Sequence, residues 1–460
     1  MPMPQLPECD ITALSPDGRG IARLPDAQGS GKALFVRGAV PGQRVAVRLT
    51  AEKRRFAEGE AVRVLAQDAS LLPPACPRAG LCGGCALQAL PYARQLHWKQ
   101  RFVDDALQRI GRQAAAQARV GAILPSPALW HYRNKMTLAF AVQQGRLVLG
   151  LRAAASHVVI PLADCPLMPE PLKAVALALA RLTNERRGGF PDHFWRFATV
   201  RLPASPAPVG GAQACLVSCL TAPASRRLRG RVAALGRELL EAGLGVTGFV
   251  HGERSRADTL PQAERVPTLL GDCTLHTTLG GVTFALRHDS FFQVNDGAAE
   301  LLCATAREFL PLAGDTPLWD LYCGVGAPGL CLARPDTTLW GVEYAPGAVA
   351  MAGENAARLG IRASYTAGDV AACLPHPPAT CPRPAAILAD PPRAGLGEGV
   401  CRALLGAAPA RILYISCNPA TLARDCALLA PTYTLTRVQA VDMFPQTPHV
   451  ECAALLERRP

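Results

Sequence analysis

The chain has 460 residues, which is too long for a single hydrophobic core and indicates two or three domains. Hydrophobic residues make up 49% and charged residues 18%, which indicates a globular protein and excludes an intrinsically disordered one. The formal net charge of +12 favours a polyanionic partner, because a basic face attracts phosphate. The alternative is a charge spread evenly over the surface for solubility.

The 17 cysteines are expected to be reduced. A secreted chain would begin with an apolar export segment, whereas this one begins with the polar, proline-rich MPMPQLPECD. We find no run of apolar residues long enough to span a membrane. We therefore expect a cytoplasmic location.

Short β patterns alternate with glycine turns over residues 9–65. Residues 17–20 (DGRG) predict a hairpin, and residues 33–36, 44–49 and 56–65 predict strands. The unit is predicted to be a partly closed OB-like barrel, a fold that commonly binds nucleic acid. Basic residues in it favour contact with RNA, although a solvated surface would also carry them: Arg19, Arg23, Lys32, Arg37, Arg44, Arg48, Lys53, Arg54 and Arg55.

Three cysteines, Cys76, Cys82 and Cys85, lie within ten residues, and two glycines separate the last two. Thiolates at this spacing can converge on one metal centre. A fourth ligand is needed, and the next cysteine along the chain is Cys165. The all-cysteine set fits either zinc or an iron-sulfur cluster, and the spacing does not choose between them. A disulfide is the alternative, which a reducing compartment disfavours.

The middle of the chain is less informative. Residues 86–111 predict an amphipathic helix, and residues 130–135 (WHYRNK) interleave aromatic and basic side chains. Such a run is suited to stacking a base and holding a phosphate, or it forms the rim of a core strand. Residues 138–267 predict mixed strands and helices.

Beyond residue 286 strands and helices alternate, which predicts a doubly wound parallel sheet with helices on both faces. The strand at 318–322 is followed by CGVGAPG, which contains GxGxxG between a strand and a helix. The next strand, 339–343, ends in Glu343, where a carboxylate usually binds ribose hydroxyls. At this point a dinucleotide enzyme and a nucleoside-cofactor methyltransferase both fit.

Polar groups end the later strands of this sheet. The third ends at Asp369, the fourth at Asp390 before Pro-Pro-Arg, and the fifth, 412–415, just before Cys417. Because ligands bind at the carboxyl ends of parallel strands, Cys417 is expected to face a crevice, whereas the alternative is a buried thiol. Glu451 follows the loop DMFPQTPHV, where a second acid is expected to face the same pocket.

The motifs DLYCGVG, GVE, DPPR, SCNPATLARD, DMFPQTPHVE and SFFQVN together resemble those of the RNA uracil-C5 methyltransferases. The barrel resembles the TRAM domain of some members, and CxxxxxCGGC with Cys165 resembles their 4Fe-4S site. The resemblance implies a TRAM-like OB barrel over 1–68, an α+β iron-sulfur and RNA-binding domain over 69–285, and a Rossmann-like class I methyltransferase domain over 286–460.

The resemblance also implies roles for individual residues. Cys417 would add to C6 of uracil, and Glu451 would remove the C5 proton after methylation. S-adenosylmethionine would be bound by Gln293, Tyr322, Glu343 and Asp390, with Asp369 near the adenine. The chain departs from the family in having Ala327-Pro328 after GVG, so a contact to the methionine part is missing or supplied elsewhere.

Ribosomal RNA is the favoured substrate, because the barrel and the cysteine motif resemble the branch of the family that acts on it. The target base must leave its stack, so a folded RNA loop is expected. A tRNA uridine methyltransferase is the alternative, and a non-catalytic iron-sulfur RNA-binding protein is an alternative of another class. We expect a monomer.

Overall fold

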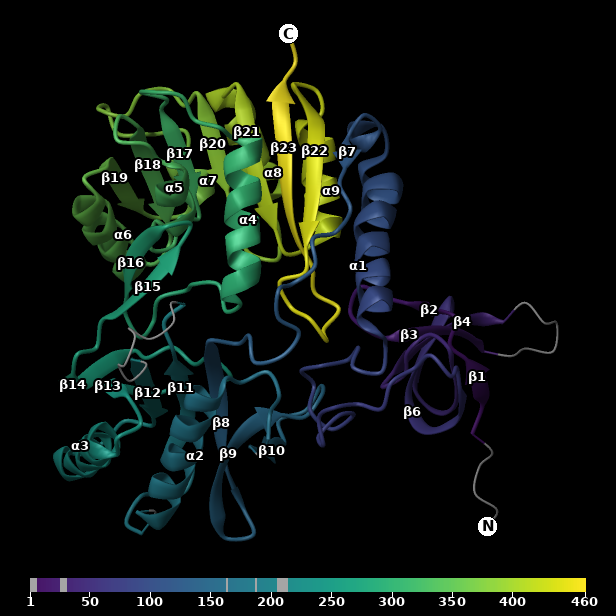
Figure 1. Ribbon diagram of the computed structural model, residues 1–460, viewed down its shortest axis with the longest axis vertical. Coiled ribbons are helices and arrows are strands. Elements are labelled where there is room, and N and C mark those ends of the chain that lie inside the picture. The colour runs from purple at the N-terminus through teal and green to yellow at the C-terminus, as the bar shows by residue number, and fades with distance from the viewer. Residues whose placement is uncertain (1–5, 25–30, 163, 187, 205–213) are drawn as a thin grey trace.

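The computed structural model describes the chain in five ranges, 6–24, 31–162, 164–186, 188–204 and 214–460. The first half of the opening segment MPMPQLPECD therefore lies outside the described residues. Within these ranges the chain forms sheets of six, seven and eight strands and one two-stranded sheet. Figure 1 shows the eight-stranded sheet at the top, the seven-stranded sheet below it, and the six-stranded sheet in purple at the lower right.

The amino-terminal sheet has the order β1-β5-β6-β4-β3-β2, and β1 approaches β3 across it, which makes a partly closed barrel. Gly18, with a φ of +84°, turns the chain between β2 and β3, so the hairpin prediction is confirmed. Alternate apolar side chains fill the barrel, including Leu34, Val36 and Val45. The strands are β1 (Glu8–Asp10), β2 (Ala13–Leu14), β3 (Gly20–Leu24), β4 (Lys32–Arg37), β5 (Gln43–Glu52) and β6 (Phe56–Gln67).

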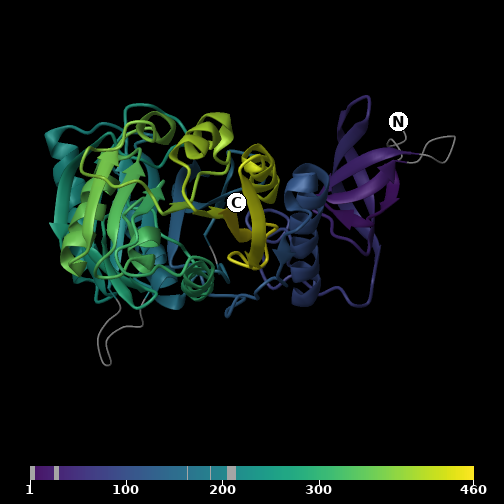
Figure 2. The same cartoon turned by 90° about the horizontal axis from the view of Figure 1, so that it is seen from above.

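Helix α1 (Tyr92–Ala106) follows the barrel and the cysteine motif, and a π-turn (Leu107–Gly111) extends it. The helix begins later than predicted because Pro91, at its N-cap, has an extended backbone. In Figure 2 α1 lies between the barrel and the carboxy-terminal sheet, and Figure 1 agrees. After α1, strand β7 (Arg119–Val120) joins the carboxy-terminal sheet as its edge.

The central sheet has the order β10-β9-β8-β11-β12-β13-β14. Helices α2 (Glu170–Glu185) and α3 (Arg226–Glu241) pack their apolar stripes into one core on the same face of the sheet. Its strands are β8 (Lys135–Gln143), β9 (Arg146–Arg152), β10 (Val159–Pro161), β11 (Trp195–Arg201), β12 (Cys215–Thr221), β13 (Val246–Glu253) and β14 (Arg265–Gly271). The small hairpin of β15 (Leu275–Leu279) and β16 (Val282–Leu286) follows and packs on the carboxy-terminal half.

The carboxy-terminal sheet has the order β19-β18-β17-β20-β21-β23-β22-β7, and its first five strands are parallel. Two apolar cores, one on each face, confirm the Rossmann-like arrangement. Strand β23 runs antiparallel to both of its neighbours, β21 and β22. The strands are β17 (Leu318–Leu321), β18 (Thr338–Glu343), β19 (Arg362–Ala367), β20 (Ala386–Ala389), β21 (Arg411–Ser416), β22 (Tyr433–Val441) and β23 (Glu451–Arg458).

Helices α4 and α5 cover one face of this sheet, and α8 and α9 cover the other. In Figure 1 the carboxyl ends of β20 and β21 point towards the central sheet. In the part of the chain that the structure describes, no helix has the length and apolarity to span a membrane. The helices are α4 (Asp296–Phe309), α5 (Ala327–Leu332), α6 (Pro346–Leu359), α7 (Val370–Cys373), α8 (Gly397–Ala407) and α9 (Pro419–Leu429).

Candidate active site

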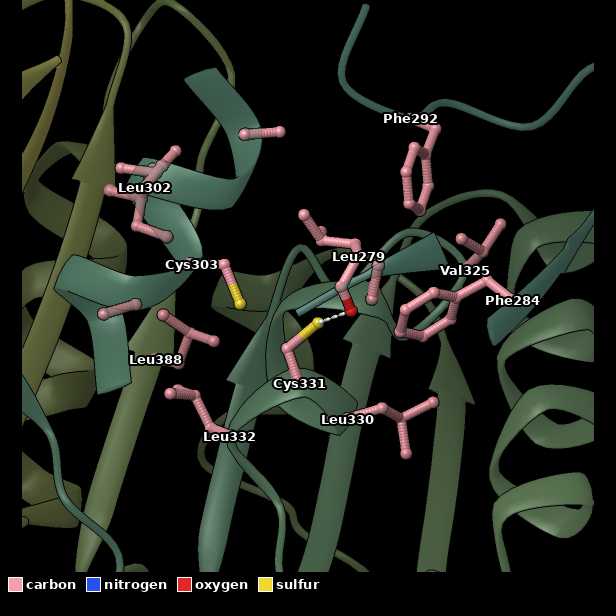
Figure 3. Close-up of a cluster of buried hydrophobic side chains, with 14 of the residues drawn as sticks. Leu279, Phe284, Phe292, Leu302, Cys303, Val325, Leu330, Cys331, Leu332 and Leu388 are labelled. Carbon is pink, nitrogen blue, oxygen red and sulfur yellow. Dashed lines mark hydrogen bonds between the residues drawn. The ribbon is translucent and has the colours of Figure 1, made fainter. Parts of the chain in front are cut away.

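An open pocket of about 700 Å³, part of it solvent, lies between the segment before α4 and the loop after β17. Gln293, Tyr322 and Asp390 line it, so three predicted cofactor residues from distant parts of the chain are brought together. Figure 3 shows its apolar wall, where the side chains of Cys303 on α4 and Cys331 on α5 face a common space. The pocket therefore combines a few polar side chains with a mostly apolar lining, as small-molecule sites usually do.

The loop after β17, residues 322–326, forms one side of the pocket. Tyr322, Gly324 and Gly326 have φ values of 63°, 53° and 83°, a left-handed run that turns the chain sharply into α5. Ala327 and Pro328 then line the pocket with apolar side chains. The two residues in which this chain departs from the family motif thus line the pocket itself.

A buried carboxylate, to which the sequence analysis gave no role, holds the end of this loop by a hydrogen bond to the start of α5. Asp320 is fully buried, and its Oδ2 accepts a hydrogen bond of 2.9 Å from the amide of Gly329. Burial raises the pKa of Asp320 to about 8. Its position in DLYCGVG, in the strand just before the glycines, was the available signal.

The other two predicted cofactor residues lie at neighbouring strand ends but do not line the pocket. Glu343, the last residue of β18, accepts hydrogen bonds from the amides of Gly324, at 3.3 Å, and Ala345, at 2.9 Å. Asp369 caps α7 by accepting from the amide of Ala372 at 3.1 Å. Burial raises the pKa of Tyr322 to about 12, and the carboxylate of Asp369 raises it further.

Cys417 directly follows β21, and Glu451 is the first residue of β23, the strand antiparallel to it. Ser416 on β21 pairs with Cys452 on β23, and the same register continued by one residue places Cys417 against Glu451. Cys417 is half-buried, and Glu451 is 5% exposed. The structure thus brings together the two residues predicted to be catalytic, with Asp390 at the end of the next strand.

Burial and like charges dominate the electrostatics of this group. Burial raises the pKa of Cys417 to about 11, with further increases from Glu451 and Asp390 and a decrease from Arg393. Burial also raises the pKa of Asp390 to about 7. The pKa of Glu451 is raised well above its ordinary value by burial and then by Asp390. In the RNA-free protein the thiol is therefore protonated at neutral pH.

Arg393 was quoted in the DPPR motif but was given no role from the sequence. Helix α9 fixes the backbone around it: Asn418 Nδ2 donates to the carbonyl of Arg393 at 3.2 Å. The guanidinium of Arg424 donates to the carbonyl of Ala394 at 2.8 Å, and buried Asp425 accepts from the amide of Leu396 at 2.8 Å. Helix α9, which follows Cys417, therefore fixes the backbone around Arg393, whose positive charge lowers the pKa of Cys417.

The four predicted metal ligands come from two loops. An isolated bridge between Cys82 and Ala153 holds the first loop, and the amide of Arg133 donates to Leu167 beside Cys165. Burial raises the pKa of Cys85 to about 12, and the thiols of Cys165, Cys82 and Cys76 raise it further: the four lie within electrostatic reach of one another. Nevertheless, no His, Cys, Asp or Glu group in the described ranges has the arrangement of a formed metal site.

Comparisons with known proteins add to this geometry. The family model for tRNA (Uracil-5-)-methyltransferase matches residues 383–459, and that for the TRAM domain matches residues 8–62. An uncharacterized RNA methyltransferase of Nitratidesulfovibrio vulgaris is 40% identical, covering 98% of this chain and 95% of its own length. The 23S rRNA (uracil(1939)-C(5))-methyltransferase RlmD of Shewanella amazonensis is 33% identical, covering 94% and 92%.

The chain belongs to the RNA uracil-C5 methyltransferase family. The fold agrees: the crystal structure of Pyrococcus abyssi tRNA (uracil-54, C5)-methyltransferase in complex with S-adenosyl-L-homocysteine matches with a TM-score of 0.75. The two chains are 22% identical, and the match covers 98% of this chain and 99% of the other. The present chain, as a member of this family, is an S-adenosylmethionine-dependent enzyme, and the alternative of a non-catalytic RNA-binding protein is wrong.

Proposed function

We propose that this methyltransferase modifies C5 of a uridine in ribosomal RNA, with Cys417 as the nucleophile and Glu451 as the base. The observation that carries the proposal is the register of β21 and β23: continued by one residue beyond the pair of Ser416 with Cys452, it sets Cys417 against Glu451, at the strand edge that also forms the pocket. Ligands bind at the carboxyl ends of the strands in such a sheet, and ionisable groups with shifted pKa values often mark functional sites.

The reaction explains why both groups are needed. C5 of uracil is a weak nucleophile, and addition of the Cys417 sulfur to C6 makes it electron-rich. After methylation C5 carries both a methyl group and a proton. Glu451 then takes that proton, and its raised pKa makes it a stronger base than an exposed glutamate. The electron pair of the C5–H bond forms the C5–C6 double bond, and the C6–S bond breaks to return the thiolate.

S-adenosylmethionine supplies the methyl group as an electrophile. We propose that Gln293, Tyr322 and Asp390 hold it in the pocket that they line. Glu343 would bind the ribose hydroxyls and Asp369 would lie near the adenine. The apolar surface of Ala327 and Pro328 favours packing against the donor instead of a hydrogen bond.

We propose further that Cys76, Cys82, Cys85 and Cys165 hold a 4Fe-4S cluster. The chemistry of the donor set supports it, since four thiols within reach of one another suit iron and sulfide. Methyl transfer has no redox step, so the cluster would organise the two loops that carry its ligands. A monomeric state and a cytoplasmic location remain predictions.

Ribosomal RNA is the favoured substrate because the relative from Shewanella amazonensis, similar over nearly the whole chain, is described as acting on 23S rRNA. The TRAM domain supports binding of RNA but does not separate the two kinds of RNA. Transfer RNA is the second candidate, because the family model that matches the catalytic segment describes tRNA enzymes.

The test offers labelled S-adenosylmethionine with unmodified large-subunit ribosomal RNA and, separately, unmodified tRNA. The control is Cys417→Ala. We expect label in 5-methyluridine of the ribosomal RNA, and none with the variant. Label in tRNA alone would move the substrate to the second candidate, and label in neither RNA would contradict the proposal.

A further inference from the structure

The loop that leads to Glu451, residues 442–450, is held by the amino-terminal half of the chain. We call it the base loop. The ammonium of Lys99, on α1, lies 2.5 Å from Asp442 Oδ1, and both side chains are completely buried. The same ammonium donates to the carbonyl of Phe444 at 2.9 Å. A buried ion pair of this kind is costly to break, because either partner alone would be an uncompensated charge.

The next two carbonyls of the base loop also accept hydrogen bonds from the amino-terminal half. The hydroxyl of Tyr132 donates to the carbonyl of Pro445 at 3.0 Å, and the amide of Leu87 donates to that of Gln446 at 2.9 Å. Leu87 lies two residues after Cys85, and Tyr132 belongs to the WHYRNK segment. Three successive carbonyls are thus occupied by groups more than 300 residues away in sequence.

Two glutamines, Gln95 and Gln446, fix the backbone conformation of the base loop at Gln446. Gln446 has a φ of +70°, which is uncommon for a residue other than glycine. Buried Gln95, on α1, donates to Gln446 Oε1 at 2.9 Å and accepts from the Gln446 amide at 2.9 Å. The reciprocal bonds stabilise a backbone conformation that would otherwise be unfavourable.

We propose that Lys99, Gln95 and Tyr132 are positioning residues that hold the base loop so that Glu451 reaches the C5 proton. The inference rests on the proposed roles of Cys417 and Glu451. Helix α1 and the WHYRNK segment would then support catalysis through the base loop, in addition to any part in RNA binding. Their contribution falls on one step, since Glu451 acts after the methyl group has arrived.

The proposal predicts a specific kinetic defect. With the base loop displaced, Cys417 still adds to C6 and the methyl group is still transferred. Proton removal from C5 slows, so the C6–S bond persists and methylated RNA stays covalently attached to the enzyme. A displacement of about 1 Å can slow such a step by about 100-fold. Loss of fold, in contrast, would slow methyl transfer and release together.

The test uses Tyr132→Phe, which removes one hydroxyl and keeps the ring. Its matched control is Tyr433→Phe, because the hydroxyl of buried Tyr433 donates to a backbone carbonyl, that of Pro409, at 2.8 Å far from the base loop. Lys99→Met is a stronger second variant, and Glu451→Gln is the reference for a lost base. Melting temperatures should fall similarly in the two tyrosine variants.

The experiment uses the full-length enzyme and the RNA that the wild type methylates. In single turnovers one measures both the label transferred to RNA and the fraction of RNA that survives denaturation attached to protein. We expect release to be at least about tenfold slower in Tyr132→Phe, with transfer nearly unchanged, and both rates to be normal in Tyr433→Phe. An equal loss of both rates, or the same defect in Tyr433→Phe, would overturn the inference.

Failure of this inference is distinguishable from failure of the proposed function. If Glu451→Gln accumulates attached RNA and Tyr132→Phe and Lys99→Met do not, the base is correct and the positioning residues are wrong. If the wild type gives no 5-methyluridine, or Glu451→Gln releases product normally, the proposed roles themselves are wrong.

Discussion

The Cys417 thiol should react slowly until RNA is bound. Burial, with Glu451 and Asp390 adding to it, raises its pKa from an ordinary 9.0 to about 11. Two pKa units correspond to about 100-fold less thiolate at any pH well below both values. Because the thiolate is the reactive form, alkylation of Cys417 at pH 7.5 should be about 100-fold slower than that of an exposed cysteine.

The assay follows the reaction of iodoacetamide with RNA-free enzyme, and mass spectrometry quantifies the tryptic peptide covering residues 412–424. The rate should increase about tenfold per pH unit up to pH 10, because the folded pKa lies near 11. Arg393→Met should slow labelling further, since its cation lowers the thiol pKa, and Glu451→Gln should speed it. A rate that levels off near pH 8.5 would refute the reasoning.

Three further predictions concern stability, binding of the methyl donor and the cysteine site. Asp320→Asn should stabilise the protein more at pH 8 than at pH 5, by on the order of a few kcal/mol, measured by thermal melting. The reason is that the folded pKa of about 8 exceeds the unfolded value, so stability falls as the pH rises between the two. Gly329→Ala should weaken donor binding in calorimetry, because its Cβ would lie 2.5 Å from Asp320 Oδ2. Anaerobically purified protein should be brown, and Cys82→Ser should remove the colour and lower the melting temperature, whereas Cys381→Ser should do neither. Colourless wild-type protein with stoichiometric zinc would contradict the iron assignment.

The parts of the site that could be predicted are those that depend on strand order alone. Cys417 and Asp390 follow buried strands of a parallel sheet, and this local pattern places them at one edge. Glu451 was placed by resemblance to a family motif, and its catalytic role stays a prediction; it begins β23, the strand that pairs with β21. Glu343 ends β18 and Asp369 closely follows β19, but neither lines the pocket: Glu343 supports the loop after β17, and Asp369 caps α7.

Long-range packing could not be predicted. The ion pair of Lys99 with Asp442 joins residues 343 positions apart, and no local pattern connects them. Likewise, β7 joins the carboxy-terminal sheet as its last strand, although its two residues lie in the amino-terminal third of the chain. Hydrophobic periodicity reports which face of an element is buried, but not which element covers it.

Trapping the covalent complex tests the central claim most directly. RNA carrying 5-fluorouridine at the target position has no C5 proton to remove, so after methylation the Cys417 sulfur cannot leave C6. With S-adenosylmethionine present, the enzyme should form a denaturation-resistant complex, and the methylated nucleotide should be found on Cys417 in the peptide of residues 412–424. Attachment at another residue, or no complex with RNA that the enzyme methylates in its natural form, would contradict the account.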